Sequence, residues 1–434
     1  MSRVNISKPL PSGASIAIIG AGVIGVASAF ELSQKGYQVV VYDDHAVGEG
    51  GPSKANAGHI AGSDIYPLST PGIHWKALKM LLNADAPLKI PLADALKQAS
   101  WFWRFWRTSQ GQRFIEATKA LSYLSTRAID DTRTMFESAN LSSLLMHKSC
   151  AYLYDSTASF EASLKSWSDK AERGFSSTEM DSEKIAIDIA GLAEHFKHGV
   201  MSHHWAIVSD PLEVVRDLAQ VAIKKGVEFK GTRVNSLSDS IDSVCLHTNQ
   251  GDYKHDLAIV ASGVHSPAFA KQAGDFLPIV AERGYNLTLP TPGFELELPL
   301  VFADRGVVAT HLSGGLRIGG WAEYAAPHRP ANQHYFKSMA GISAELFPNA
   351  NFDRARFWMG NRPSTPDSVP VISKSAIADR IFYNCGHGHY GLTYAASSAR
   401  ILCDLIAGDS MTGNSIIGDG VDDAYARYSI HRFL

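Results

Sequence analysis

The chain of 434 residues is 45% hydrophobic and 19% charged, which is typical of a globular enzyme and excludes a disordered or fibrous protein. The formal net charge of −3 provides no global basic field that would attract nucleic acid. Four widely separated cysteines lack metal-ligand spacing and indicate reduced thiols rather than a disulfide framework. The length exceeds that of one compact core, so we expect two domains.

The first predicted elements are a strand over residues 15–19, a helix from about residue 23 to 34 and a strand over residues 38–42. Residues 15–30 are almost wholly apolar and resemble the core of a signal peptide. A weakly basic flank, no small-residue cleavage site and three glycines at fixed spacing favour a buried strand, a turn and a packed helix instead. Without a targeting segment, we predict a cytoplasmic protein.

The rest of the chain alternates helical and extended segments. Residues 73–140 have apolar spacing near 3.6 and are predicted to be mainly helical. Short strands and one helix are expected between residues 150 and 205. The remaining predicted elements are a helix over 211–225, strands over 227–230 and 257–261, a meander of strands over 277–321 and a helix over about 393–406.

A glycine-rich motif, Gly-Ala-Gly-Val-Ile-Gly, joins the first strand to the first helix. Gly20 permits a tight turn, Gly22 lets the backbone approach a pyrophosphate, and Gly25 lets the helix pack closely on the strand. Asp43 ends the second strand, where an acidic side chain can bind ribose hydroxyls. The unit indicates a dinucleotide site made of Gly20, Gly22, Val23, Ile24, Gly25 and Asp43, with Asp44 as the rival acid.

The motif alone does not distinguish FAD from NAD. A nicotinamide enzyme would continue with regular βα units, whereas this chain breaks into the loop Pro-Ser-Lys-Ala-Asn-Ala-Gly over residues 52–58. That loop resembles the Ser-x-Ala-Asn-Ala-Gly loop of the FAD-dependent D-amino-acid dehydrogenases, in the D-amino-acid oxidase superfamily. The resemblance covers nearly the whole chain through residues 277–288, 317–320, 358–367 and 386–393, although Arg283 replaces the family's usual lysine.

The resemblance implies an α/β fold, with a Rossmann-like FAD-binding domain of the D-amino-acid oxidase type and an inserted α+β substrate domain. Residues 1–72, 205–276 and 355–434 are expected to form the FAD-binding domain. Residues 73–204 and 277–354 are expected to form the substrate domain with a helical insertion. FAD is expected to be noncovalent, because no cysteine or histidine matches an attachment position of the covalent relatives. The further cofactor-binding residues implied are Ser53, Asn56, Ala57, Gly58, Gly263, Gly388, Gly391, Leu392 and Thr393.

The implied reaction is oxidative deamination of a D-amino acid: a hydride passes from the α-carbon to flavin N5, and the imino acid hydrolyses to a 2-oxo acid and ammonia. Arg362 is expected to hold the substrate carboxylate through two hydrogen bonds, with a strand-bridging arginine as the alternative. Tyr285 could donate its hydroxyl to the same carboxylate or be a core tyrosine. His387, with His389 and Tyr390, is expected to line the flavin or the substrate pocket. The start of the last helix is expected to stabilise negative charge on the reduced flavin.

Other functions stay open at this level. The substrate could be D-proline, hydroxyproline, glycine or sarcosine, or the chain could be a flavin-binding subunit of a redox complex or a nicotinamide dehydrogenase. The expected partners are a small amino-acid substrate and, as electron acceptor, a quinone or another respiratory carrier, with no nucleic acid and no metal. The aromatic-basic run over residues 101–107 is expected to form a buried helix, with peripheral attachment to the inner face of the plasma membrane as the alternative.

Overall fold

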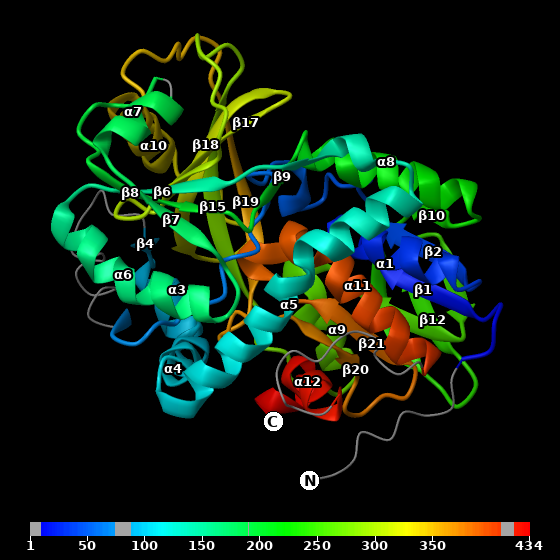
Figure 1. Cartoon of the computed structure of the whole chain (residues 1–434). Coiled ribbons are helices and arrows are strands. Elements are labelled where there is room, and N and C mark those ends of the chain that lie inside the picture. Colours follow the sequence, from blue (N-terminus) through cyan, green and yellow to red (C-terminus); the bar gives the residue numbers. More distant parts are fainter. Residues whose placement is uncertain (1–9, 74–87, 190, 409–420) are drawn as a thin grey trace.

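The computed structural model describes residues 10–73, 88–189, 191–408 and 421–434. Figure 1 shows two lobes, each built around its own β-sheet, with the long helix α5 (Gly111–Ser138) crossing the front of the molecule. This is the α/β architecture with two sheets that the sequence implied.

The first sheet has six strands in the order β10-β2-β1-β14-β21-β20, and only β20 is antiparallel to its neighbour. The central strands are short apolar runs, as expected of a parallel sheet that is covered on both faces. Strand β1 pairs with β2 on one side and with β14 on the other, so its carboxyl end is a topological switch point, where α/β proteins bind ligands. The strands are β1 (Ser15–Ile19), β2 (Gln38–Asp43), β10 (Glu228–Gly231), β14 (Leu257–Val260), β20 (Val371–Lys374) and β21 (Ile381–Cys385).

Helices cover one face of this sheet, and a small sheet covers the other. Helix α1 (Val23–Gln34) is apolar almost all round because it is buried in the same core as α8 (Pro211–Lys224) and α11 (Gly391–Ala407). The opposite face carries a separate core. Its elements are β11 (Val234–Asp239), β12 (Val244–Thr248), β13 (Gly251–His255) and α9 (Ser266–Gln272). The predicted first strand, first helix, second strand and the helix after residue 210 are confirmed.

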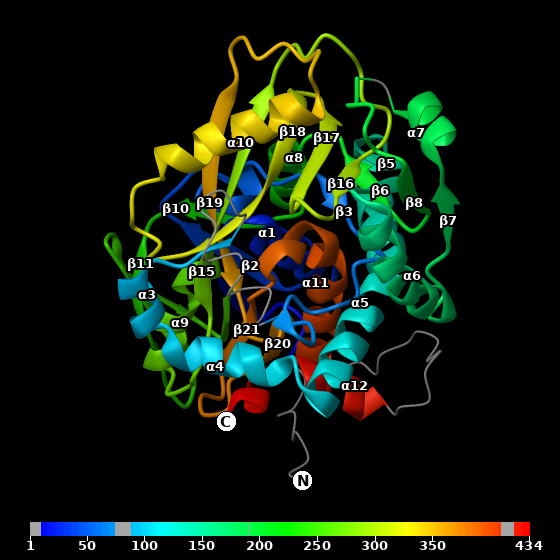
Figure 2. The same ribbon diagram turned by 90° about the vertical axis from the view of Figure 1, so that its left-hand side faces the viewer.

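The second sheet has nine strands, eight of them in the order β19-β15-β18-β17-β16-β6-β8-β7, while β4 pairs with β18. Helix α10 (Gln333–Leu346) lies across one face of it (Figure 2), where Met339 and Leu346 share a core with Leu287 and Ile318. The other face contributes to a cavity shared with the first sheet. The strands are β4 (Leu88–Lys89), β6 (Cys150–Tyr154), β7 (Ser177–Met180), β8 (His198–Ser202), β15 (Val280–Leu289), β16 (Leu300–Phe302), β17 (Val307–Leu312), β18 (Gly315–Tyr324) and β19 (Arg356–Ser364).

Strand β19 corrects the expected domain boundary. Residues 355–434 were expected to belong to the FAD-binding domain, but β19 is hydrogen-bonded along its whole length to β15. The second sheet therefore extends to Ser364, ten residues of chain past the expected end of the substrate domain at residue 354. The meander expected over residues 277–321 is present as β15 to β18.

The expected helical segment contains α3 (Leu92–Lys97), α4 (Ala99–Thr108) and α5, and its residues 74–87 lie outside the described part of the chain. Helix α5 packs on α11 of the first lobe: the hydroxyls of Ser125 and Tyr394 are 2.8 Å apart. The helical insertion is therefore fastened to the cofactor-binding half of the molecule. The other elements are β3 (His59–Ile60), β5 (Leu145–His147), β9 (Ala206–Val208), α6 (Thr157–Glu172), α7 (Ser182–Asp188), α12 (Val421–Tyr428) and the 3-10 turns η1 (Pro52–Lys54), η2 (Ser142–Leu144), η3 (Gly263–His265), η4 (Gly388–Tyr390) and η5 (Ile430–Phe433).

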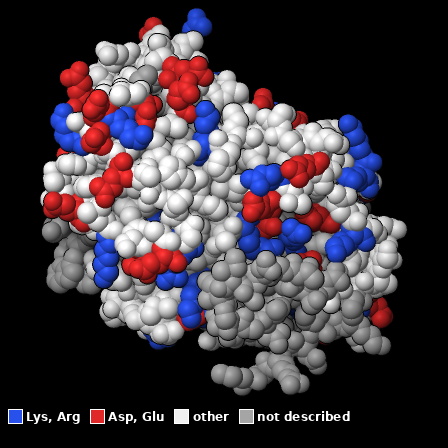
Figure 3. Space-filling view, in the orientation of Figure 1, with Lys and Arg blue, Asp and Glu red and all other residues white. Residues whose placement is uncertain are grey.

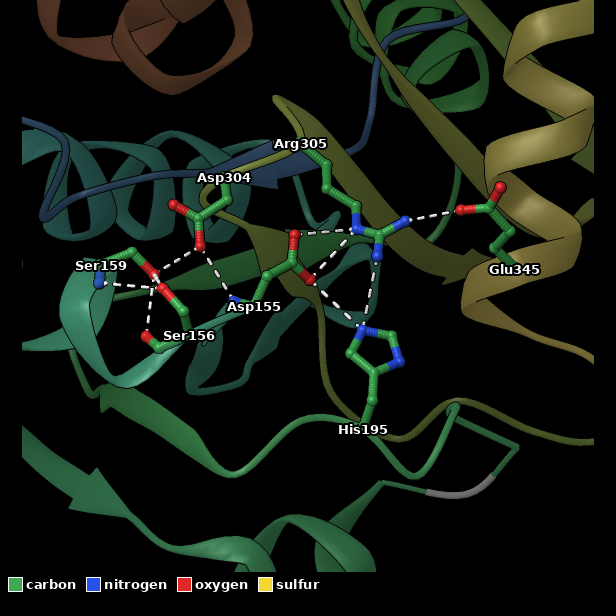
Figure 4. Close-up of polar contacts among 7 residues, drawn as sticks. All are labelled: Asp155, Ser156, Ser159, His195, Asp304, Arg305 and Glu345. Carbon is green, nitrogen blue, oxygen red and sulfur yellow. Dashed lines mark hydrogen bonds and ion pairs between the residues drawn. The ribbon is translucent and has the colours of Figure 1, made fainter.

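A surface network of polar side chains joins three parts of the second lobe (Figure 4). Arg305, in the turn between β16 and β17, donates from Nε to Asp155 at 3.0 Å and from Nη1 to Glu345 of α10 at 2.9 Å. Asp304 accepts hydrogen bonds from the backbone of Asp155 at 2.9 Å and from the hydroxyl of Ser159 at 2.6 Å. Such exposed ion pairs contribute little stability individually, so the main effect of the network is to hold the neighbouring turns in place relative to one another.

The charged side chains of the surface are mixed in sign. On the face shown in Figure 3, acidic and basic side chains alternate over both lobes and form no extended patch of one sign. Among the helices of the described residues, none is both long enough and apolar enough to cross a bilayer.

Candidate active site

A cavity of about 1230 Å³ lies between the two sheets. This volume exceeds the range of about 300–1,000 Å³ that is typical of a pocket for one small ligand, so it has room for a large cofactor and a small substrate. Gly25 and Gly58 do not border it. The other predicted site residues do: Gly20, Gly22, Val23, Ile24, Asp43, Ser53, Asn56, Ala57, Gly263, Tyr285, Arg362, His387, Gly388, Gly391, Leu392 and Thr393.

The glycines of the first turn are required by close approaches of the backbone. Gly20 has φ +112°, and a Cβ there would lie 2.6 Å from the carbonyl oxygen of Ala261. A Cβ on Gly25 would lie 1.9 Å from the carbonyl oxygen of Gly20, so only glycine lets α1 start this close to β1. Gly22 is the residue before α1 and borders the cavity, which leaves the amino end of the helix accessible to a phosphate.

Asp43 and Ser53 hold the rim of this turn. The carboxylate of Asp43 accepts hydrogen bonds from the backbone N–H groups of Ala21 at 2.8 Å and His45 at 2.9 Å. The hydroxyl of Ser53 accepts a hydrogen bond from the N–H of Val23, the first residue of α1, at 3.0 Å. Both side chains thus lie at the mouth of the dinucleotide turn, where they were expected.

The loop over residues 53–58 connects the two lobes through its backbone. The carbonyl of Ala55 accepts a hydrogen bond from Asn286 Nδ2 at 2.7 Å, and the carbonyl of Asn56 accepts one from Arg317 Nη1 at 2.8 Å. Asn286 belongs to β15 and Arg317 to β18 of the second sheet. Gly58 has φ +74°, which favours glycine where the chain turns into β3. The loop therefore attaches the cofactor half to the substrate half through its backbone.

The amino end of α11 forms another part of the cavity wall. Gly391, Leu392 and Thr393 border the cavity, so the positive end of the helix dipole lies at its edge. The hydroxyl of Thr393 accepts a hydrogen bond from Ala61 N at 3.1 Å and donates to the carbonyl of His59 at 3.2 Å. The threonine side chain thus fastens α11 to the segment around β3.

Arg362 lies opposite Glu282 on the neighbouring strand, because the register pairs these two residues of β19 and β15. Arg362 Nη1 donates to Glu282 Oε1 and to the carbonyl of Trp321, both at 3.1 Å. Among the described residues, no hydrogen bond is made by Nε or Nη2. That edge of the guanidinium can therefore take a carboxylate through two parallel hydrogen bonds.

Glu282 is a fully buried carboxylate surrounded by donors. Ser364 donates to its Oε2 at 2.8 Å, Tyr324 donates to the same oxygen at 3.3 Å, and His389 Nε2 contacts its Oε1. Burial by itself raises the pKa of Glu282, but His389, Arg362 and Ser364 outweigh it and lower the pKa to about 2. Glu282 is therefore ionised at neutral pH despite its burial.

The sequence contained a signal for Glu282 that the motif comparison missed. Buried charges in proteins are almost always paired, and Glu282 is the one acidic residue of β15, a strand that also carries Arg283, Asn286 and Thr288. A partner on an adjacent strand could therefore have been sought, and Arg362 is that partner. His389 was expected to line the pocket. Its contact with Glu282 was not expected, because the two residues are 107 positions apart in the chain and no local sequence pattern links them.

Tyr285 borders the cavity, but its hydroxyl points elsewhere. It donates to Glu323 Oε2 at 2.7 Å and accepts a hydrogen bond from the N–H of Asn332 at 3.2 Å. Its ring packs edge-on against Tyr335 of α10, on the face of the sheet away from Arg362. Arg283 is fully buried on the same side and pairs with Glu323 at 2.9 Å. The structure thus matches the core-tyrosine alternative and does not bring this hydroxyl to a ligand of Arg362.

His387 borders the cavity as expected and is almost fully buried. Its burial lowers the pKa of His387 to about 3, so the ring is neutral at physiological pH. Both ring nitrogens lack a hydrogen-bond partner among the described residues. His387 therefore contributes a neutral polar ring to the wall beside the start of α11.

Helix α4 is buried on one side only. Trp101 is 3% exposed and donates from Nε1 to the carbonyl of Ser364 at 3.2 Å, whereas Trp103 is 50% and Trp106 44% exposed. Phe102 and Phe105 line the cavity together with Trp106. The expected buried helix is thus a wall of the site with an aromatic outer face.

The features of the cavity fit FAD. A dinucleotide turn opens into it, Asp43 and Ser53 lie at that turn, and the opposite end reaches the second sheet, which leaves space beyond the cofactor for a substrate beside Arg362. The hydroxyl of Thr232 lies in the wall and is buried without a partner among the described residues, so it can take a polar group of the cofactor. Fold and site together define a flavin-dependent oxidoreductase.

The comparisons with known proteins identify the family. A family model described as FAD dependent oxidoreductase matches residues 15–405, and the chain belongs to this family. It is 30% identical over 427 residues to a D-amino acid dehydrogenase of Allorhizobium ampelinum, covering 96% of this chain and 99% of the relative. It is 28% identical over 406 residues to a D-amino-acid oxidase of Bradyrhizobium diazoefficiens, covering 92% and 96%.

Solved structures share the fold at low identity. Glycine oxidase from Geobacillus kaustophilus aligns with a TM-score of 0.75 at 17% identity, covering 96% of this chain and 98% of that one. L-proline dehydrogenase from P. horikoshii aligns with a TM-score of 0.70 at 15% identity, covering 98% of both chains. The FAD-dependent oxidoreductase and its fold, expected from the sequence, are thereby confirmed.

Proposed function

We propose that this chain catalyses the oxidative deamination of D-amino acids with noncovalently bound FAD. The observation that carries the proposal is the position of Arg362, which borders the shared cavity. The Nε–Nη2 edge of its guanidinium has no hydrogen-bond partner among the described residues. Arg362 is partly buried, and an arginine with a free edge can bind a planar carboxylate through two parallel hydrogen bonds. The names of the two bacterial relatives support the choice of D-amino acids.

In this proposal Arg362 anchors the substrate carboxylate and so fixes where the α-carbon lies. The aromatic wall from α4 keeps water away from the reacting carbon. When bound, FAD accepts the hydride and thus both electrons from the α-carbon, and the protein supplies orientation and electrostatics. The released imino acid hydrolyses to a 2-oxo acid and ammonia.

Anaerobic mixing with D- and L-amino acids tests the proposal. The purified yellow protein is expected to lose its flavin absorbance with D-amino acids carrying a free carboxylate and to stay oxidised with their L-enantiomers. Bleaching by L-forms only, or equal bleaching by both, would overturn the D-specificity. A protein that binds FAD and is bleached by no amino acid would be a flavin-binding subunit instead.

Glycine, sarcosine and D-proline are the second candidate substrates. The structural similarity to a protein named glycine oxidase favours glycine, and the similarity to one named L-proline dehydrogenase favours a cyclic imino acid without supporting its D-configuration. All of these compounds carry the carboxylate that Arg362 would hold, so this residue does not discriminate among them. Adding them to the same anaerobic panel ranks them by the rate constant of flavin reduction.

We propose a quinone or another respiratory carrier as electron acceptor, reached by peripheral attachment to the inner face of the plasma membrane. The supporting feature is the outer face of α3 and α4, where Leu96 is 74% and Trp103 50% exposed and Arg107 stacks over Trp103 at 4.4 Å. Co-sedimentation with vesicles containing anionic lipids is the test. The Leu96→Ser/Trp103→Ser variant should bind less, while Ile241→Ser, on an exposed turn elsewhere, should bind as wild type does.

A further inference from the structure

The pairing of His389 with Glu282 determines which ring nitrogen of His389 carries a proton. Glu282 is ionised, and an ionised carboxylate only accepts hydrogen bonds. Nε2 of His389, which contacts Glu282 Oε1, must therefore be the protonated nitrogen. In a neutral imidazole the other nitrogen, Nδ1, is then a hydrogen-bond acceptor. Nδ1 makes no hydrogen bond with any described residue, His389 borders the cavity, and its side chain is 32% exposed.

We propose that His389 is the base that takes a proton from the substrate ammonium group before hydride transfer, and that Glu282 is the positioning residue that holds it. The inference rests on the proposed function, because it assumes a zwitterionic amino acid on Arg362. One N–H bond of the ammonium group breaks and an Nδ1–H bond forms on His389. The electron pair of the broken bond stays on the nitrogen and becomes the lone pair that forms the C=N bond when the hydride leaves.

The charges of the site support this transfer. Before it, the substrate carboxylate faces Arg362, while the ammonium group has no counterion of its own. Afterwards, the imidazolium of His389 faces Glu282, and the carboxylate still faces Arg362, so each charge has a partner of opposite sign. Opposite charges a hydrogen bond apart stabilise each other strongly in a poorly solvated site. The neutral amine that remains is the form that can release a hydride.

The other titratable groups around His389 do not change this balance. Among the described residues, Glu282 from β15 and Arg362 from β19 are the charged groups of its hydrogen-bond network, and Tyr324 from β18 shares Glu282 with it. Tyr390 and His387 are its neighbours in the chain. Burial lowers the pKa of His387 to about 3, so this ring is neutral and a much weaker base. Burial raises the pKa of both tyrosines well above the usual range, so both hydroxyls stay neutral. Proton acceptance at this end of the cavity therefore falls to His389.

The pH dependence of flavin reduction tests the base. D-Alanine is mixed with the enzyme under anaerobic conditions. The efficiency of flavin reduction by wild type should not change with pH between the pH at which the base of the free enzyme loses its proton and the pKa of the substrate amine. The His389→Asn variant can react only with the minor, already neutral amine. Its efficiency should therefore be lower by about 100-fold or more near pH 7 and rise about tenfold per pH unit toward the wild-type value. A His389→Asn profile parallel to that of wild type would overturn the proposal.

Glu282→Gln distinguishes positioning from a merely structural role. The amide still accepts from Nε2, but it removes the negative charge that stabilises the imidazolium. The acid limb of the profile should therefore move to lower pH, and the plateau should fall. Reduced efficiency without displacement of the limb would overturn the role of Glu282. His247→Asn is the matched control: His247 Nδ1 lies 3.0 Å from Asp252 Oδ1 on an outer hairpin, and its variant should behave as wild type does.

A binding measurement gives a readout that does not depend on turnover. 2-Methylalanine carries both charged groups but no α-hydrogen, so its binding can be followed through the flavin absorbance without oxidation. Its affinity for wild type should fall at low pH, because a protonated His389 cannot accept from the ammonium group, and His389→Asn should lack this fall. Isobutyrate, which has no amine, should show no such fall with either protein. Equal pH dependence of 2-methylalanine binding in both proteins would overturn the proposal. If no D-amino acid reduces the wild-type flavin, the proposed function fails separately.

Discussion

Gly284 lies directly beneath the guanidinium group of Arg362: a Cβ added to Gly284 would stand 2.3 Å from Cζ and from Nη2 of Arg362. Real Cβ atoms do not approach other atoms so closely, so the arginine lies in this position only because residue 284 has no side chain. Gly284 thereby fixes the height of the proposed carboxylate anchor above the sheet.

Gly284→Ala is therefore expected to displace Arg362 and to lower the efficiency of amino-acid-dependent flavin reduction by at least about tenfold, since misplacement by about 1 Å can cost 100-fold. The control is Gly341→Ala in α10, where an added Cβ meets nothing within 4 Å. Stopped-flow reduction at equal FAD content compares the two. Wild-type efficiency in Gly284→Ala would show that the guanidinium adapts or does not hold the substrate.

Arg362→Ala should lose about 2–4 kcal/mol of transition-state stabilisation, because a charge-assisted, two-pronged contact in a dry site disappears. Arg362→Lys should recover only part of this, since an ammonium group cannot form the same fork. FAD content should stay that of wild type. If Arg362→Ala reduces its flavin with wild-type efficiency, the arginine only compensates Glu282 and the carboxylate ligand lies elsewhere.

Acid should destabilise wild type more than Glu282→Gln. The folded-state pKa of Glu282, about 2, lies below the ordinary value of 4.5, so its contribution to stability is complete above about pH 4.5 and is lost as the pH falls through about 2. The additional loss in wild type is on the order of 3 kcal/mol across that window. Urea unfolding at a series of pH values measures it. Parallel stability curves would mean that the carboxylate is not held in its ionised form.

FAD should be released intact from the denatured chain without proteolysis, as expected of a noncovalent cofactor. Gly25→Ala should bind little FAD, because a Cβ there would lie 1.9 Å from Gly20 O and push α1 away from the dinucleotide turn. Gly231→Ala, with open space around its Cβ, should retain wild-type FAD content. Flavin that stays attached to peptide after denaturation would contradict the noncovalent prediction.

The first sheet could be read from the sequence because its signals are local. An apolar run, three glycines at fixed spacing and an acid at the end of the next strand all occur within residues 15–43, and the structure has β1, α1 and β2 there. The helix after residue 210 has a comparable local signal: the side chain of Asp210 caps it, and Pro211 follows.

The substrate half could be predicted only in part because it depends on pairings between distant segments. β6 pairs in parallel with β16 some 150 residues later, and no local periodicity specifies that neighbour. The face of Tyr285 could have been predicted from alternation along the strand. Glu282 and Gly284 face the cavity together with Arg362. Arg283 and Tyr285 alternate with them and so point to the opposite face, where both contact Glu323.

The loop over residues 53–58 touches the cofactor cavity with its side chains while its carbonyls bind Asn286 and Arg317 of the other lobe. A ligand that orders this loop therefore also strengthens the attachment of one lobe to the other. By thermodynamic linkage, occupancy of the flavin site and association of the lobes must reinforce each other equally. The holoprotein should consequently melt as one cooperative unit, and loss of flavin should loosen the substrate lobe before its own sheet unfolds.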